Sequence, residues 1–526
     1  MAKLTIDNRV RVECGQAAAD ELRAEFTYDN PEKAALKRLE GALRGIPNNK
    51  RLRGAYFSAQ KAPEKITTWA EDEAGQLSFA RGSLDRVLAI VERHEPYSVD
   101  DRTTLGDPAV GAIRGEMKLE LRPYQERLVE TGLERRQGLM RSPTGSGKTV
   151  ACYALALRVG VPVLVIVWRE ALLKQWVQRA PRELGIRPDD VGTIGGGRAD
   201  RVRPLTIGMQ QTLLARGDRY AGTFGCVIAD EIDRFAAKSL YATADLFRAR
   251  WRIGVGADER RKDRKEFLIY DQFGDVLVAI DREELGDAVI DVEHRLVPTD
   301  FAPQWYVDMP EQARGYAEDR LLDAMIASDE RNVLAARIAA EEIKAGQQVL
   351  AFAHNRAHVR RLEADLRRAV PGLPAAATGA MLGSPADRPE FDRCVDGFNA
   401  GTLRFAATTY EAGAYGLDLP SVSRGVAVTP IHRNRSKLNQ VCGRLCRTSA
   451  GTGKRDAVLY SLWDRKLFGL APLRASLRLA PERTKVLLGG RWVDGREVLR
   501  DAKDEELEPA ALAERYGADD LITAVR

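Results

Sequence analysis

The sequence predicts an α/β protein, because segments typical of strands alternate with segments typical of helices around two patterns suited to phosphate chemistry. The first pattern is "LMRSPTGSGKTVA" at residues 139–151, which predicts a strand end, a glycine-rich turn and a helix start. The second is "FGCVIADEID" at residues 224–233, a hydrophobic strand that ends in acids. A further strand and helix are expected at residues 347–362. Such alternation favours parallel sheets covered by helices, and 526 residues suffice for roughly three or four domains.

The composition fits a soluble globular protein in a reducing, cytoplasmic compartment. Hydrophobic residues make up 44% of the chain and charged residues 30%. Apolar runs such as "VPVLVIVW", which starts at Val161, are far shorter than the roughly 20 residues that a membrane span needs. The opening "MAKLTIDNRVRVE" has no secretory apolar region, and the six scattered cysteines form no CxxC pair.

Basic residues are clustered, although the net charge is only +5. The densest places are residues 201–203, 259–266, 354–362 and 431–437. One such cluster is usually a solvated surface. Several clusters beside the two phosphate patterns favour contact with a nucleic-acid backbone.

The glycine-rich turn is expected to hold ATP. Small residues let successive backbone N–H groups point at the β-phosphate, and the following helix N-terminus adds a favourable dipole. The Lys148 ammonium can reach the β- and γ-phosphates, and the Thr149 hydroxyl can ligate Mg²⁺. Ser142 stands where the usual pattern has its first glycine. The predicted ATP contacts of the turn are Pro143, Thr144, Gly145, Ser146, Gly147, Lys148 and Thr149.

The two acids Asp230 and Glu231 complete the predicted hydrolytic site. Acids after a strand are common on surfaces, but these follow a buried strand about eighty residues after a phosphate loop. Asp230 can hold Mg²⁺ together with Thr149, and Glu231 can orient and deprotonate the attacking water. Lys148, Asp230 and Glu231 are therefore predicted catalytic residues.

With these motifs the chain resembles a superfamily-2 helicase of the DExH type, in the XPB/UvsW-like group, along nearly its whole length. "LRPYQ" at residues 121–125 resembles the adenine-reading motif, so Arg122 and Gln125 are expected to contact ATP. "VLVIVWREALLKQW" (163–176) and "LTIGMQQTL" (205–213) resemble two motifs that contact nucleic acid. "RIGVGADERRKD" (252–263) resembles motif III.

Three later segments resemble the motifs of a second helicase lobe: "QQVLAFAHNRAHVRRL" (347–362), "LRFAATTYEAGAYGLDLP" (403–420) and "QVCGRLCR" (440–447). The resemblance implies two tandem RecA-like parallel-sheet lobes with ATP and Mg²⁺ between them, a small α+β N-terminal domain and a short C-terminal extension. The implied boundaries are 1–115, 116–298, 299–478 and 479–526.

The second lobe is expected to supply Gln440, Arg444 and Arg447 to catalysis, and Gly416 and Asp418 to ATP binding. An arginine from outside the phosphate-loop lobe neutralises charge on the γ-phosphate and raises the rate by about 10³–10⁵. Hydrolysis is thereby tied to closure of the lobes. The implied nucleic-acid contacts of both lobes are Arg169, Gln210, His354, Asn355, Arg356, Thr408 and Thr409.

The function that the resemblance implies is an ATP-dependent DNA helicase or translocase of 3′ to 5′ polarity, in recombination, branch migration, replication restart or repair. Its partner would be single-stranded, duplex or branched DNA, with no membrane and no obligate protein partner, in a prokaryotic or phage-infected cell. Motif III departs from the usual wording at Gly256-Ala257-Asp258, so hydrolysis is a safer expectation than processive unwinding. The alternatives are a duplex translocase of a restriction or defence system, a nucleic-acid-binding scaffold with weak ATPase, and an RNA helicase.

The ends of the chain carry weaker signals. In the N-terminal domain, Lys50, Arg51 and Arg53 are candidates for duplex contact, although a mere packing role is as compatible. A linker is expected at residues 100–116, the last strand of the second lobe at 456–464 and a hairpin near 485–495. His354 and His358 stand four apart, but without a third ligand both are expected to be surface histidines.

Overall fold

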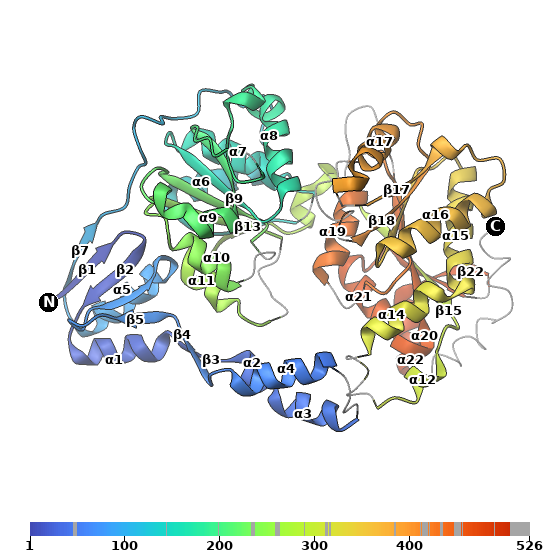
Figure 1. Cartoon of the computed structure of the whole chain (residues 1–526), viewed down its shortest axis with the longest axis horizontal. Coiled ribbons are helices and arrows are strands. Elements are labelled where there is room, and N and C mark those ends of the chain that lie inside the picture. The colour runs from blue at the N-terminus through green and yellow to red at the C-terminus, as the bar shows by residue number, and fades with distance from the viewer. Residues whose placement is uncertain are drawn as a thin grey trace. The chain divides into compact units, whose positions relative to one another are not determined.

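The computed structural model describes residues 1–504, except 46–49, 144, 198, 233–236, 258–262, 289, 311–313, 315–316, 383–384, 411, 413–418, 420, 432–434, 447–453, 455 and 489. The chain forms two compact units (Figure 1). The first comprises Met1–Glu40 and Leu52–Leu285, and the second Gly41–Arg51 and Gly286–Arg526. Among the described residues, none of the helices has the length and apolar character to span a bilayer.

The first unit contains a seven-stranded parallel sheet in the order β10-β11-β9-β12-β13-β8-β14. Its strands are β8 (Gln137–Arg141), β9 (Val163–Val167), β10 (Gly192–Ile194), β11 (Leu205–Met209), β12 (Cys226–Asp230), β13 (Trp251–Gly256) and β14 (Val276–Ala279). Its helices are α6 (Pro123–Arg135), α7 (Lys148–Arg158), α8 (Glu170–Leu184), α9 (Gln210–Arg216), α10 (Ala237–Ala244) and α11 (Phe267–Phe273).

The central strands of this sheet are apolar and buried along their whole length. β9 reads VLVIV and β12 reads CVIAD, and every residue of both is buried. Continuous apolar runs of this kind are typical of parallel strands with both faces covered by helices. The sheet order places β8 beside β13 and β13 beside β12, so the carboxyl ends of these three strands meet at one edge. Ligands bind at such an edge in open α/β sheets.

The N-terminal segment folds as a mixed sheet in the order β5-β6-β2-β1-β7. Its elements are β1 (Ala2–Ile6), β2 (Arg9–Glu13), α1 (Gln16–Glu25), β5 (Trp69–Glu71), β6 (Leu77–Ala80), α5 (Leu84–His94) and β7 (Tyr97–Asp101). A separate two-stranded ribbon pairs β3 (Thr27–Asp29) with β4 (Lys65–Thr67). Between these two strands the chain forms α2 (Pro31–Ala34), α3 (Leu36–Gly45) and α4 (Lys50–Lys61).

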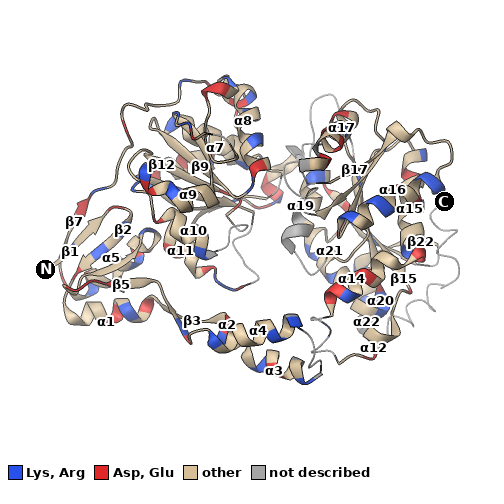
Figure 2. Ribbon diagram, in the orientation of Figure 1, with Lys and Arg blue, Asp and Glu red and all other residues tan. Residues whose placement is uncertain are grey.

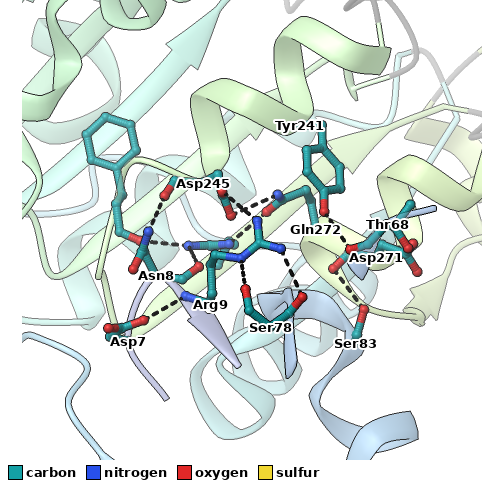
Figure 3. A network of polar contacts seen from close by, with 12 residues as sticks. Asp7, Asn8, Arg9, Thr68, Ser78, Ser83, Tyr241, Asp245, Asp271 and Gln272 are labelled. Atoms are coloured by element: carbon teal, nitrogen blue, oxygen red, sulfur yellow. Dashed lines mark hydrogen bonds and ion pairs between the residues drawn. The ribbon is translucent and has the colours of Figure 1, made fainter. Parts of the chain in front are cut away.

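A polar seam joins the N-terminal sheet to the seven-stranded sheet within the first unit (Figure 3). Arg9 forms an ion pair with Asp245 at 2.8 Å, and the Asn8 amide donates to the Asp245 carbonyl at 2.7 Å. The fully buried Arg252 of β13 donates to the Gln272 side chain at 2.9 Å and to the Asn8 carbonyl at 3.4 Å. Because the buried Arg252 and Gln272 and the half-buried Asn8, Arg9 and Asp245 bond to one another across the seam, the two sheets form one packed body.

The predicted linker, residues 100–116, is hydrogen-bonded to the first unit at several points. The backbone of Thr104 exchanges hydrogen bonds with Arg248 and Arg250, at 2.8 and 3.0 Å. Further on, the Glu116 N–H donates to the Leu184 carbonyl at 3.0 Å and the Lys118 N–H to the Glu183 carbonyl at 2.9 Å.

The second unit contains an eight-stranded sheet in the order β17-β18-β16-β19-β20-β15-β21-β22. Its strands are β15 (Val292–Thr299), β16 (Val349–Ala353), β17 (Thr378–Met381), β18 (Phe405–Thr409), β19 (Arg424–Ala427), β20 (Ala457–Asp464), β21 (Thr484–Leu488) and β22 (Arg491–Asp494). Its helices are α12 (Gln304–Val307), α14 (Glu318–Ala327), α15 (Asp329–Lys344), α16 (Arg356–Ala369), α17 (Arg388–Asn399), α19 (Arg435–Leu445), α20 (Arg465–Phe468), α21 (Ala471–Leu479) and α22 (Gly495–Asp504).

The predicted fold class, two parallel-sheet lobes with a small N-terminal α+β domain, is confirmed by these three sheets. The predicted hairpin is also confirmed, since β21 and β22 pair antiparallel. Residues 457–464 form the predicted strand, β20, but the expectation that it is the last strand of the lobe is wrong. β21 pairs in parallel with β15, so the hairpin prolongs the sheet beyond β15. The four domain boundaries stay predictions, and the one at 298/299 falls within β15.

Candidate active site

The predicted phosphate loop connects β8 to α7 in a tight curl. Gly145 and Gly147 both have positive φ, +94° and +79°, which glycine adopts without steric cost. The buried Ser142 donates its backbone N–H to the Gly256 carbonyl of β13 at 3.0 Å, and its hydroxyl lies 2.6 Å from the Ser146 hydroxyl. These bonds hold both arms of the curl, with Lys148 as the first residue of α7.

The Lys148 side chain folds back over the loop. Its ammonium donates to the Ser142 carbonyl at 3.0 Å and to the Pro143 carbonyl at 3.1 Å. A cation held at the mouth of a helix N-terminus attracts anions, and the exposed ends of the helix N–H groups add to that field. The loop therefore has the charge and backbone geometry of a phosphate site.

Residues of α6 support the loop from behind. The Gln125 amide donates to the Ser146 carbonyl at 2.9 Å, and its oxygen accepts the Arg122 backbone N–H at 3.0 Å. The Tyr124 hydroxyl donates to the same Ser146 carbonyl at 2.9 Å. A Cβ at Gly147 would lie 2.4 Å from the Gln125 amide nitrogen, so the close approach requires glycine. Gln125 thus positions the loop, and its contact with adenine stays a prediction.

Asp230 lies at the buried end of β12 and receives a hydrogen bond from Trp176 of α8, with 2.9 Å between the indole nitrogen and Oδ2. Both side chains are almost fully buried. Burial raises the pKa of the Asp230 carboxyl above its ordinary value, whereas the Trp176 hydrogen bond and the nearby charge of Lys148 act in the opposite direction. Asp230 and Lys148 are therefore electrostatic neighbours across the loop.

Glu231 has φ of +53°, the left-handed region that a residue with a side chain adopts at a cost of about 1–3 kcal/mol. The turn directs the backbone away from the line of β12 immediately after Asp230. Strain of this kind persists only where the surrounding structure imposes it, and it is concentrated at functional sites. The next residue, Ile232, is buried and packs into the core of the sheet, which anchors the turn.

The donors at this edge fit Mg²⁺. Thr149 supplies a hydroxyl oxygen from the first turn of α7, and Asp230 a carboxylate from β12. Mg²⁺ prefers oxygen ligands and is usually held by one or two protein groups together with substrate phosphates. The buried Asp230 carboxylate beside the phosphate loop meets that requirement. Among the described residues, no cluster of three or more His, Cys, Asp or Glu suited to a metal occurs.

The predicted site residues of the second unit are only partly described. Arg444 is buried on α19, the helix that follows the loop after β19. On the same helix, Cys442 Sγ lies 3.3 Å from His294 Nε2 of β15, which ties α19 to the sheet. Thr144, Gly416, Asp418 and Arg447 lie outside the described residues, as does the side chain of Gln440.

The predicted nucleic-acid contacts differ in exposure. His354 and Arg356 are exposed, whereas Gln210 and Thr408 are buried. Arg169 stacks on the Trp168 ring, with 4.1 Å between its guanidinium carbon and the ring centroid. Thr408 donates to the Met381 carbonyl at 3.0 Å, Thr409 accepts the Ala412 N–H at 3.2 Å, and Asn355 accepts the His358 N–H at 2.9 Å as N-cap of α16. Nucleic-acid contact by these residues stays a prediction.

The expectation that His358 is a surface histidine is wrong. His358 faces the core because the N-cap at Asn355 sets the start of α16, and its Nε2 lies 2.9 Å from the Asn332 oxygen. Burial, with the charges of Arg331 and Arg361, lowers the pKa of His358 to about 3. His354, four residues earlier, is exposed, so the two rings do not share a surface.

Sequence reasoning missed Trp176 and Tyr124, although both lie inside segments that it singled out. "KQW" ends the segment that resembles motif Ia, and "RPYQ" contains Tyr124. The spacing of apolar residues in α8 places Trp176 on its buried face, so the sequence could have indicated that this side chain packs against the sheet. Its partner, Asp230, lies 54 residues away and could not be identified from the sequence.

Comparison with known proteins agrees with this geometry. Residues 118–258, which span the phosphate loop and both acids, match the family described as "Type III restriction enzyme, res subunit". A "Putative DNA 3'-5' helicase Rad25" of Halobacterium salinarum is 33% identical over 213 residues, which cover 38% of this chain and 34% of that protein. A "DNA 3'-5' translocase XPB2" of Sulfurisphaera tokodaii is 30% identical over 173 residues, 33% of this chain and 38% of that protein.

A longer but weaker match extends over most of the chain. The "DNA 3'-5' helicase XPB" of Kineococcus radiotolerans is 22% identical over 467 residues, 86% of this chain and 77% of that protein. The crystal structure of T4 UvsW covers 88% of this chain with 14% identity and a TM-score of 0.39. The chain spans about a third of the length of the first two curated relatives.

Proposed function

We propose that the chain is an ATP-dependent DNA helicase or translocase of 3′ to 5′ polarity, like the Rad25 and XPB2 proteins to which part of it is similar. The observation that carries the proposal is the meeting of the phosphate loop, Asp230 and Glu231 at the carboxyl edge of one parallel sheet. The names of the relatives supply the nucleic-acid substrate and the polarity. Roles in recombination, replication restart and repair belong to the proposal as well.

In the first unit, each step of hydrolysis has a residue suited to it. Backbone N–H groups of the loop bind the β-phosphate, and Lys148 leaves its loop carbonyls to contact the β- and γ-phosphates. Thr149 and Asp230 would hold Mg²⁺, which when bound neutralises charge on the phosphate oxygens. Glu231 orients the attacking water and accepts its proton. The hydrogen bond from Trp176 fixes the Asp230 carboxylate in the orientation that metal binding requires.

The second unit is proposed to complete the site with Gln440, Arg444 and Arg447, and to contact ATP through Gly416 and Asp418. Arg444 and Arg447 are three residues apart, so on one helix they would face the same way. Charge neutralisation by arginine from outside the phosphate-loop lobe accelerates phosphoryl transfer by about 10³–10⁵. Hydrolysis would then require both units, which is how ATP turnover is converted to movement along a strand.

A second candidate function is translocation along duplex DNA without strand separation. The match of residues 118–258 to a restriction-enzyme subunit family favours it. The unusual Gly256-Ala257-Asp258 sequence, at the end of β13, is where hydrolysis and unwinding would be uncoupled. The two candidates share the ATPase site and differ in whether strands separate.

The test is steady-state ATP hydrolysis without nucleic acid and with single-stranded, duplex and branched DNA and RNA, alongside strand displacement on the best activator. We expect DNA to stimulate hydrolysis and a 3′ overhang to be required for displacement. Stimulation by duplex without displacement supports the translocase. Stimulation by RNA alone contradicts the proposal. Glu231→Gln should abolish turnover while ATP binding is retained, and the exposed Glu130→Gln of α6 is the matched control.

A further inference from the structure

The segment between β3 and β4 carries more positive charge than the whole protein. Residues 31–61 contain eight Lys and Arg and two Glu, a net charge of +6, whereas the complete chain has +5. The remainder of the protein is therefore close to neutral, and its cations are widely used in ion pairs with neighbouring acids. We call residues 30–64 the basic insertion, because they interrupt the N-terminal α+β fold between the two paired strands.

Hydrogen bonds join the first and last residues of the basic insertion. The Asn30 N–H donates to the Glu64 carbonyl at 2.9 Å, and the Asn30 amide donates to the Pro63 carbonyl at 2.9 Å. In the strand before the insertion, Tyr28 stacks on Phe267 of α11, with ring centroids 4.2 Å apart. Within the insertion, Lys33 of α2 donates to the Gln60 carbonyl of α4 at 3.1 Å. The two ends of the basic insertion are therefore held together beside the β3–β4 ribbon.

The helix α4 has two distinct faces. Leu52 and Ala59 are buried on one face. Lys50, Arg53, Phe57 and Lys61 recur at spacings of three and four residues, so they line the opposite face, and all four are exposed. Phe57 is 53% exposed. The stripe runs for about 16 Å, from the rise of 1.5 Å per residue.

The helix α3 repeats this arrangement. Leu39 is buried, whereas Lys37, Arg38 and Arg44 are exposed. Among the described residues no ion pair engages Lys37, Arg38, Lys50, Arg53 or Lys61, and Figure 2 marks the Lys and Arg positions of the ribbon in blue. Cations gathered without acidic partners repel one another, so their collection on two exposed faces calls for an anionic partner.

Resting on the DNA-dependent function proposed above, we propose that the basic insertion binds the phosphate backbone of duplex DNA through the exposed faces of α3 and α4. A duplex carries one charge per about 1.7 Å of its axis with both strands counted, so a 16 Å length of duplex beside the stripe carries about nine or ten phosphates, of which one face offers a part. A single-strand site would need successive aromatic side chains for base stacking. The exposed face of α4 carries three cations, at spacings of three and eight residues, and one exposed aromatic, and α3 adds exposed cations, which suits a phosphate array better than stacked bases.

The test compares two full-length variants with the same loss of charge. The insertion variant is Lys37→Gln, Arg38→Gln, Lys50→Gln and Arg53→Gln. The control variant is Lys3→Gln, Arg114→Gln, Arg219→Gln and Arg248→Gln, all exposed positions outside the insertion and the active site. Fluorescence anisotropy of a labelled 20-base-pair duplex and of a single strand of the same length gives Kd between 50 and 300 mM salt. ATP hydrolysis without DNA reports folding of the active site.

We expect the insertion variant to bind the duplex at least ten-fold more weakly at 0.1 M salt. The slope of log K against log salt should fall by about 3 to 4, since each lost phosphate contact removes about 0.9. The control variant should stay within two-fold of the wild type, and both should keep the basal ATPase. Equal duplex binding and slope in the wild type and the insertion variant overturn the inference, as does equal weakening by the control. A larger loss on the single strand overturns the assignment to duplex. Failure of the wild type to bind any DNA contradicts the proposed function itself.

Discussion

The indole of Trp176 donates its hydrogen bond to Asp230, the acid at the end of β12, across 2.9 Å of buried space. Trp176 is in turn held by Tyr153 of α7, whose hydroxyl donates to the Trp176 carbonyl, and the two rings lie with centroids 4.5 Å apart. The helix that begins with Lys148 and the helix that carries Trp176 therefore meet behind Asp230. An indole N–H is a donor only, so it fixes one carboxylate oxygen and leaves the other to a cation.

Replacing Trp176 with Phe should weaken the response to Mg²⁺. The substitution keeps an aromatic ring in the core but removes the donor that orients Asp230, and groups that hydrogen-bond a metal ligand typically contribute 10–100-fold to metal affinity. The Mg²⁺ concentration for half-maximal ATP hydrolysis should rise about ten-fold, with a smaller change in kcat at saturating Mg²⁺. Tyr153→Phe is the control because it keeps the indole donor. An unchanged Mg²⁺ dependence in Trp176→Phe would show that Asp230 needs no such support.

Gly147→Ala should abolish nucleotide binding. Gly147 has φ of +79°, and an added Cβ would lie 2.4 Å from the Gln125 amide nitrogen, which supports the loop through Ser146. Both the backbone preference and the contact with Gln125 oppose the substitution. Gly160→Ala is the control that separates the effect of the backbone conformation from that of the close contact. Gly160 also has a positive φ, +67°, but an added Cβ there meets no other atom within 4 Å. Calorimetric titration with ATP should show binding lost in Gly147→Ala and kept in Gly160→Ala. Equal affinity in both variants would be the contrary result.

Gly82→Ala should loosen the seam between the N-terminal sheet and the seven-stranded sheet. A Cβ at Gly82 would lie 2.3 Å from the backbone nitrogen of Gly274 and 2.5 Å from that of Phe273. Backbone atoms cannot yield as a flexible side chain can, so the cost should reach about 3 kcal/mol or more. Urea unfolding followed by tryptophan fluorescence should show a lower midpoint. Gly54→Ala meets nothing within 4 Å and should leave the midpoint unchanged or slightly higher.

Local patterns were sufficient to predict the phosphate loop and the strand that ends in Asp230, whereas the two parallel-sheet lobes were expected from the family resemblance. "GLMRSPTGSGKT" and "CVIAD" carry their structure in adjacent residues, through glycine turns and continuous apolar runs. The hairpin β21–β22 was equally local. In each case the residues that determine the local structure lie within about ten positions of one another, so a single sequence is enough to predict it.

Contacts between distant segments could not be predicted. Arg252 is fully buried and bonds to Asn8, 244 residues away, although its text, "WRIG", is that of an ordinary strand. Arg81 reaches the carbonyls of Ala249 and Arg250 at 2.6 and 2.9 Å, and burial lowers its pKa to about 9. Buried arginines are rare enough that sequence patterns assign them to the surface. His358 was misassigned for the same reason.

Acid should destabilise the second unit through His358. Burial lowers its pKa to about 3, from about 6.5 in the unfolded chain, and its Nδ1 has no hydrogen-bond partner among the described residues. Between pH 6.5 and 3 the unfolded chain therefore binds a proton that the folded chain does not, so stability is full above pH 6.5 and falls as the pH drops. From pH 7 to pH 5 this histidine should remove about 2 kcal/mol from the free energy of unfolding.

Urea unfolding of the wild type and of His358→Gln at pH 7, 6 and 5 measures this contribution. His358→Gln should start less stable at pH 7, because a buried hydrogen bond to Asn332 is perturbed, but its stability should fall less steeply with acid. His354→Gln, which changes an exposed ring, should keep the slope of the wild type. Parallel pH profiles for the wild type and His358→Gln would mean that His358 takes up its proton in the folded chain as readily as in the unfolded one.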